Sequence, residues 1–117
     1  MSRLEDLIHR FTSQKKHLDR AIEICSQQQG IVVEIGLGSG RTFDHLREKL
    51  PKHKLFSFDY RIETHPGCPP PPEQAVLGDI ADTLPPFAQQ QGPSATLIHV
   101  DVGTKNRDED KVRYKAM

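Results

Sequence analysis

The sequence lacks the features that would direct a protein to nucleic acid, to a membrane or to secretion. Its sixteen basic and sixteen acidic residues leave no net charge, so no basic excess would drive phosphate binding by counterion release. No apolar run approaches the length of a membrane span. The charged N-terminus has no apolar segment of the kind found in secretory signals. We therefore expect a cytoplasmic protein with neither a nucleic-acid nor a membrane partner.

Tryptophan is absent and only two cysteines occur. Cys25 continues an apolar helical face and Cys68 lies in a proline-rich segment, and neither has a partner at metal-ligand spacing, so both are expected to be reduced thiols. A chain of 117 residues is long enough for one small domain. We divide it into N-terminal helices (1–29), a core (30–103) and a charged tail (104–117).

The most informative stretch follows the first predicted strand, the β-branched apolar run at 31–35. Glycines then occupy every second position: Gly36, Gly38 and Gly40. Apolar residues recur at helical spacing from residue 41 to residue 50, which gives the order strand, glycine turn, helix. Glycine lets the backbone approach a ligand closely, and a helix N-terminus offers unpaired N–H groups. This order is typical of a nucleotide-type cofactor site.

The glycine spacing and one acid help to decide which cofactor is bound. Dinucleotide-binding proteins carry G-x-G-x-x-G, whereas this chain reads G-x-G-x-G, which argues against an NAD-dependent oxidoreductase. Glu34 stands two residues before the first glycine, where a carboxylate would repel a pyrophosphate. It would instead suit a ligand that carries an ammonium group.

The N-terminal segment has an apolar face that is interrupted at Thr12 and Ser13. We predict two helices, at 2–11 and 13–28, with Thr12 or Ser13 as N-cap of the second. The first helix could form a wall over the cofactor or pack plainly against the sheet, and plain packing is the simpler interpretation.

The rest of the chain alternates between strands and connections. A second strand at 55–60 carries Asp59 near its end, an acid that can accept from both ribose hydroxyls of a nucleoside. The prolines that follow predict an irregular loop over 61–73 instead of a crossover helix. A third strand covers 74–80. A short helix then begins with Asp82 or Thr83 as its cap and a proline near its first position, and it ends at Gln91. A fourth strand at 95–102 is apolar on both faces, as in an interior strand.

Taken together, these motifs resemble class I S-adenosylmethionine (AdoMet) methyltransferases, and in particular a small family of short bacterial AdoMet methyltransferases. The residues that carry the resemblance are Glu34 to Glu48, His65-Pro66, Leu77 to Ile80, and His99 to Asp101. The resemblance implies an α/β fold with a Rossmann-like parallel sheet in the order 3-2-1-4. The C-terminal strands of the usual seven-stranded sheet are expected to be missing.

The resemblance also implies which residues contact AdoMet. Glu34 and Gly36 would meet the methionine end, Asp59 the ribose, and Asp79 with Ile80 the adenine. The full set of predicted cofactor-binding residues is Glu34, Gly36, Leu37, Gly38, Ser39, Gly40, Asp59, Tyr60, Asp79 and Ile80.

The candidate catalytic residues are Asp101 and His99, which lie on one face of the fourth strand. Either could act as a general base, and His99 could equally be a core histidine. Asp101 could also ligate a divalent metal, as the corresponding acid does in some relatives. Those relatives supply further carboxylate and amide ligands after a fifth strand, which this sequence lacks, so we expect no metal.

The predicted function is methyl transfer from AdoMet to an unidentified acceptor, expected to be a small molecule. The alternative is a binding module that holds AdoMet or S-adenosylhomocysteine without turnover, or a truncated assembly subunit, because the half of the fold that usually shapes the acceptor pocket is missing. The fourth strand would then lie at an open sheet edge. We therefore expect the chain to form a homodimer.

Overall fold

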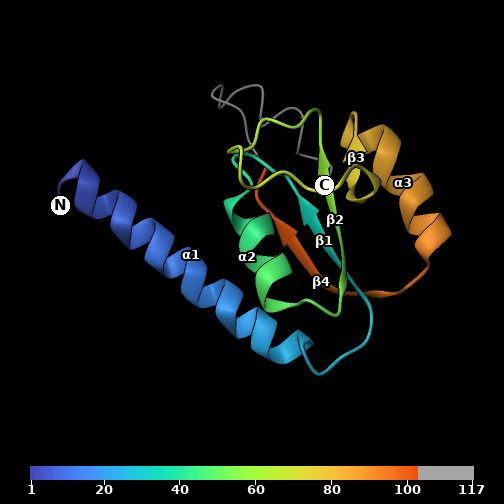
Figure 1. Cartoon of the computed structure of the whole chain (residues 1–117), viewed down its shortest axis with the longest axis horizontal. Coiled ribbons are helices and arrows are strands. Elements are labelled where there is room, and N and C mark those ends of the chain that lie inside the picture. The colour runs from blue at the N-terminus through green and yellow to red at the C-terminus, as the bar shows by residue number, and fades with distance from the viewer. Residues whose placement is uncertain (103–117) are drawn as a thin grey trace.

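A computed structural model describes residues 1–102 of the chain. Within this range, helices and strands alternate after a long first helix (Figure 1). The elements are α1 (Arg3–Cys25), β1 (Ile31–Ile35), α2 (Arg41–Lys49), β2 (Lys54–Asp59), the 3₁₀ turn η1 (Pro72–Gln74), β3 (Ala75–Leu77), α3 (Ile80–Gln91) and β4 (Ala95–Val100).

The four strands form one sheet in the order β3-β2-β1-β4, and every pair of neighbours is parallel. This is the order predicted from the resemblance, and the α/β Rossmann-like fold is confirmed. Helices α1 and α2 lie on one side of the sheet and α3 on the other (Figure 1). The first turns of α1 extend beyond the rest of the molecule.

Two apolar clusters hold these layers together. On the α2 side, Val32 of β1 packs with Phe43 and Leu46 of α2, both fully buried. On the α3 side, Val33 and Ile35 pack with Phe58, which Phe87 of α3 meets edge-on at a ring-centroid distance of 4.9 Å. Because β1 is buried on both faces, its β-branched residues occupy the centre of the core.

The N-terminal segment is one continuous helix, so the prediction of two helices was wrong. Ser2 caps α1, because its hydroxyl accepts from the Glu5 N–H while the Glu5 carboxylate accepts from the Ser2 N–H. Thr12 and Ser13 lie inside the helix. Their helix propensities are only modestly unfavourable, and a long helix docked through buried Leu18 and Cys25 absorbs that cost.

The helix that connects β3 to β4 begins earlier than predicted. Strand β3 ends at Leu77 and α3 begins at Ile80, with Asp79 as N-cap through a bond from the Ala81 N–H to its Oδ1 (2.9 Å). Asp82 and Thr83 are therefore helical residues. Pro85 and Pro86 lie inside α3 instead of at its start, and the packing of Leu84 and Phe87 against the sheet compensates for their helix-breaking tendency.

The loop at 61–73 is irregular, as the prolines predicted; its only helical residues are Pro72 and Glu73, which begin η1. Arg47 of α2 fixes this loop by donating from Nη1 to the Pro69 carbonyl at 2.9 Å. The predicted charged tail (104–117) lies outside the described residues.

Strand β4 occupies one edge of the sheet and is more exposed than an interior strand. Ile98 is 58 % exposed and Val100 is 53 % exposed, although their neighbours Val33 and Ile35 on β1 are buried. Helix α3 covers β1 and β2 on this side but leaves these two residues open.

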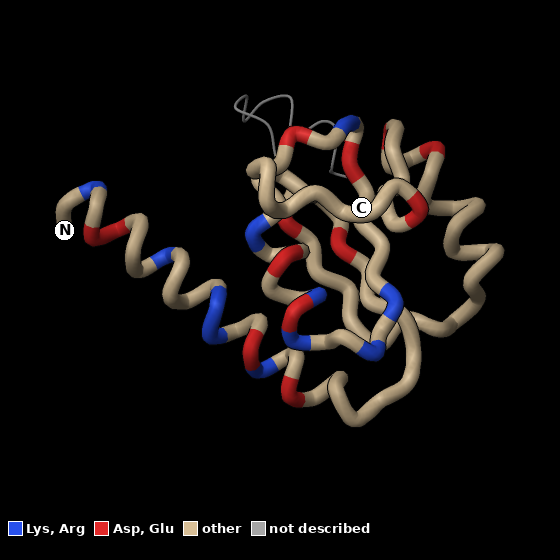
Figure 2. Tube along the Cα trace, viewed as in Figure 1, with Lys and Arg blue, Asp and Glu red and all other residues tan. Residues whose placement is uncertain are grey.

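Basic and acidic residues alternate along α1 and α2, whereas α3 carries a single charged residue (Figure 2). In the described part of the chain, no helix combines the length and the apolarity needed to cross a membrane.

Candidate functional site

The glycine turn lies where the strand connections change direction, between β1 and β4. The first crossover leads from β1 to β2 on one side, and β4 returns to the other side of β1. Open parallel sheets bind their ligands at the carboxyl ends of the strands beside such a switch point. The Asp101 N–H donates to the Ile35 carbonyl at 2.9 Å, so the residues that follow β1 and β4 meet at this point.

Asp59, at the end of β2, holds the glycine turn in place. Its Oδ2 accepts from the Leu37 N–H at 2.9 Å and from the Gly38 N–H at 3.3 Å. The carboxylate therefore orders the loop as well as standing where a ribose ligand was predicted. Its contact with ribose stays a prediction.

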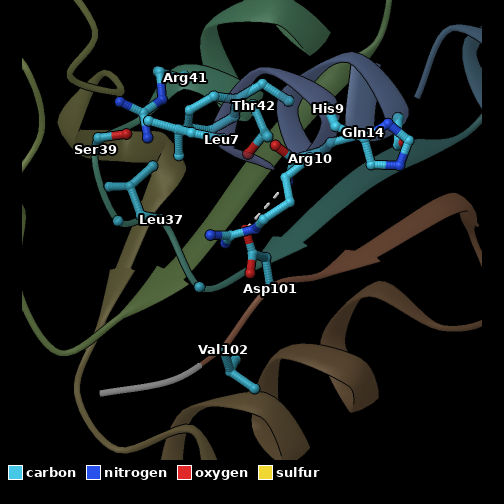
Figure 3. A pocket seen from close by; sticks show the side chains of 14 residues that line it. Leu7, His9, Arg10, Gln14, Leu37, Ser39, Arg41, Thr42, Asp101 and Val102 are labelled. Carbon is cyan, nitrogen blue, oxygen red and sulfur yellow. Dashed lines mark hydrogen bonds between the residues drawn. The ribbon is translucent and has the colours of Figure 1, made fainter. Parts of the chain in front are cut away.

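A cavity of about 860 Å³ opens beside the glycine turn, within the range of about 300–1,000 Å³ typical of ligand sites. Three parts of the chain line it: the middle of α1, the glycine turn with the start of α2, and the residues after β4 (Figure 3). The predicted site residues among its lining are Gly36, Leu37, Gly38, Ser39 and Asp101.

Helix α1 thus forms a wall of this cavity in addition to packing on the sheet. Gln14 donates from Nε2 to Oδ2 of Asp101 at 3.3 Å, which ties the helix to the end of β4. Oδ1 of Asp19 lies 2.6 Å from Nε2 of His45, and this contact joins α1 to α2. The continuous helix makes this possible, because its docked C-terminal half holds Leu7 to Gln14 at the cavity that the glycine turn also lines.

Glu34 lies behind the cavity wall instead of in it. Its side chain is 1 % exposed; Oε1 accepts from the Thr42 hydroxyl at 2.8 Å, and Oε2 lies 3.3 Å from His99 Nδ1. The hydrogen bond with Glu34 raises the pKa of His99 above its usual range, against the opposing effect of burial. The contact with Glu34 therefore favours the protonated form of His99. Of the three residues joined by these bonds, Thr42 is the one that lines the cavity. The predicted contact of Glu34 with an ammonium group stays a prediction.

The residues predicted for the nucleoside end gather at the carboxyl ends of β2 and β3. The Tyr60 hydroxyl donates to Asp79 Oδ2 at 3.1 Å, so these side chains lie side by side near Asp59. Ile80 packs against the apolar cluster on the α3 side. Their contacts with adenine stay predictions.

The backbone of the glycine turn leaves room for a ligand. The three glycines of the turn adopt positive φ angles: Gly36 at 95°, Gly38 at 53° and Gly40 at 83°. A Cβ on Gly38 would meet nothing within 4 Å, so space is free above the turn, where a ligand can approach the main chain. In the described part of the chain, no group of three or more His, Cys, Asp or Glu residues could hold a metal ion.

Sequence reasoning missed the cavity residues of α1 and α2, among them Arg10, Gln14 and Arg41. A signal did exist, because Leu7, Arg10, Phe11 and Gln14 follow the spacing of one helical face. The predicted break at Thr12 separated Gln14 from the other three and hid this pattern.

The comparisons with known proteins agree on one family. A family model described as S-adenosyl-L-methionine methyltransferase matches residues 1–117. The chain is also similar to a crystal structure of an S-adenosyl-L-methionine methyl transferase from Silicibacter pomeroyi, with 38 % identity and a TM-score of 0.84. That similarity covers 96 % of this chain and 70 % of the other. No curated protein matches the chain.

Proposed function

The chain belongs to the S-adenosyl-L-methionine methyltransferases, and from that premise we propose that it methylates a small molecule held in the cavity between α1 and the glycine turn. The observation that carries this proposal is Asp101, which lines the cavity and follows β4 beside Gly36. When bound, AdoMet supplies a methyl group already activated by its sulfonium. The task left to the chain is to align an acceptor and, where needed, to take its proton.

The proposed proton acceptor is the Asp101 carboxylate. Gln14 donates to one of its oxygens, which fixes the carboxylate and leaves the other oxygen for an acceptor O–H or N–H. His99 is less suited to this task because its raised pKa and its bond with Glu34 favour the protonated ring. We assign it the role of positioning Glu34. A cytoplasmic location is part of the proposal, supported by the free thiols of Cys25 and Cys68.

Replacing Asp101 with asparagine should lower turnover and leave cofactor affinity nearly intact. General base catalysis contributes about 10²–10⁴-fold, so S-adenosylhomocysteine production in a mixture of small cellular metabolites should fall by about 100-fold or more. The Kd for S-adenosylhomocysteine, measured by calorimetry, should change less than about threefold. Unchanged turnover in Asp101→Asn would contradict the assignment, and a wild-type chain without turnover on any small-molecule fraction would contradict the small-molecule acceptor.

We further propose that the chain self-associates through β4. In the described part of the chain β4 pairs only with β1, so its outer edge offers unpaired backbone groups. The exposed Ile98 and Val100 add apolar surface beside that edge. Pairing with β4 of a second copy across a two-fold axis would satisfy these backbone groups and cover this apolar surface.

Light scattering over a concentration series should therefore show a dimer that Ile98→Lys converts to a monomer. Leu77→Lys is the matched control, because Leu77 is similarly exposed (49 %) but lies on the opposite edge strand, β3. A wild-type monomer at every concentration would contradict the proposal, as would equal effects of the two substitutions.

A further inference from the structure

Two arginines line the cavity, one from each of the two helices beside it. Arg10 comes from α1 and Arg41 is the first residue of α2, and both line the cavity with His9 close by on α1. Figure 3 shows Arg10 reaching into the cavity toward Asp101, the single acidic residue of its lining.

Neither of these guanidinium groups is neutralised within residues 1–102. No ion pair joins Arg10 or Arg41 to an acid in that range, whereas Arg20 pairs with Glu23 at 3.2 Å and Arg47 with Asp44 at 2.8 Å. Arg20 of α1 and Arg47 of α2 thus have acids at pairing distance, whereas, in the described part of the chain, the two cavity arginines do not. The cavity arginines therefore present hydrogen-bond donors to whatever the cavity holds.

Arg41 is held in place without using its donors. Its guanidinium lies 4.7 Å from the centroid of the Phe11 ring, and stacking of this kind leaves the N–H groups at the edge of the guanidinium plane available. The N-cap of α2 is Gly40, which has no side chain to accept from the first turn. The positive end of the helix therefore adds to the field of Arg41.

The charge of the cofactor decides what these arginines are for. AdoMet is a net cation, because its sulfonium and ammonium groups outnumber its single carboxylate. When bound, it adds positive charge to a cavity whose lining already has two arginines and one aspartate. A neutral or cationic acceptor would leave this excess uncompensated at close range, whereas an anionic acceptor would balance it.

We propose that the methyl acceptor carries a carboxylate or phosphate group that Arg10 and Arg41 hold, with its nucleophilic atom directed toward Asp101. This inference rests on the proposed function, because it identifies the class of small molecule that the same cavity takes. Both guanidinium groups offer the paired N–H donors that match a planar carboxylate or a phosphate face. In the transfer, the acceptor's lone pair forms the new bond to the methyl carbon, the C–S electron pair stays on sulfur, and the acceptor's proton passes to Asp101.

The test uses the chain saturated with S-adenosylhomocysteine and two probes, inorganic phosphate and malonate, titrated separately by calorimetry. We expect at least one probe to bind saturably at millimolar concentration or below, and the stronger of the two identifies the anion as phosphate or carboxylate. In the double variant Arg10→Gln/Arg41→Gln, affinity for that probe should fall tenfold or more. The matched control Arg20→Gln, on α1 but paired with Glu23, should leave it unchanged.

The competing assignment is that the arginines hold the carboxylate of the cofactor itself. The double variant would then lose affinity for S-adenosylhomocysteine but keep affinity for 5′-methylthioadenosine, which has no amino-acid group; that outcome would overturn the proposal. No probe binding to the wild type, or equal probe binding to the double variant, would also overturn it. Failure of the wild type to bind S-adenosylhomocysteine at all would instead count against the proposed function. Thermal melting and the two single variants check that a loss of binding is not a loss of folding.

Discussion

Replacing Asp59 with alanine is expected to weaken binding of AdoMet and S-adenosylhomocysteine by about tenfold or more. The carboxylate accepts from the backbone N–H groups of Leu37 and Gly38, and it stands at the end of β2 where we predict the ribose. Hydrogen bonds to a charged group contribute about 1.5–3 kcal/mol each, and 1.4 kcal/mol corresponds to a factor of ten in affinity.

The comparison variant is Asp101→Asn, which removes a cavity carboxylate that does not bond to the glycine turn. Calorimetry on both variants should show a large loss of affinity for Asp59→Ala and a small one for Asp101→Asn. The variant Asp59→Asn keeps one acceptor oxygen and should fall between wild type and Asp59→Ala. Equal affinities for wild type and Asp59→Ala would mean that the nucleoside end of the site has been assigned to the wrong place.

Replacing Gly36 with alanine should destabilise the whole fold. A Cβ at this position would lie 2.0 Å from the Asp101 carbonyl oxygen, and Gly36 has a φ of 95°. Because the contact is with backbone, no side chain can rotate away, and β1 and β4 would have to separate at their carboxyl ends. Overpacking costs about 1–3 kcal/mol and adds to the backbone strain of about 1–2 kcal/mol at a positive φ, so the Tm of a domain of this size should fall by about 10 °C or more.

Gly38 provides the matched control for this substitution. It also has a positive φ, of 53°, but its Cβ would meet nothing within 4 Å. Gly38→Ala should therefore cost only the backbone strain of about 1–2 kcal/mol, with a correspondingly smaller loss of Tm. Its methyl group would stand in the cavity wall and should reduce cofactor affinity. Similar melting temperatures for the two variants would contradict the close approach of β1 and β4 at Gly36.

The centre of the fold could be predicted because its signals are local. The short β-branched run before Gly36 favours a buried strand, and the glycines after it favour a tight turn before a helix. The prolines between residues 61 and 73 excluded a helix in the same local way. The strand order came from the resemblance to a family, since parallel strands are paired by contacts far apart in sequence.

The cavity wall could not be predicted because it depends on how α1 docks. Ser2 and Glu5 form a capping box that the sequence displays, yet Thr12 and Ser13 look like a second helix start. Tertiary contacts on both sides of this point, Phe11 with Arg41 and Gln14 with Asp101, favour one helix. The environment of Glu34 was hidden for the same reason, because Thr42 and His99 reach it from different elements.

The central claim is that the glycine turn binds AdoMet, and calorimetric titration of one protein sample with AdoMet, S-adenosylhomocysteine and NAD tests it most directly. We predict saturable binding of AdoMet and S-adenosylhomocysteine and no binding of NAD, because the G-x-G-x-G spacing of the turn departs from the G-x-G-x-x-G spacing of dinucleotide-binding proteins. Saturable binding of NAD with no response to AdoMet would contradict the account.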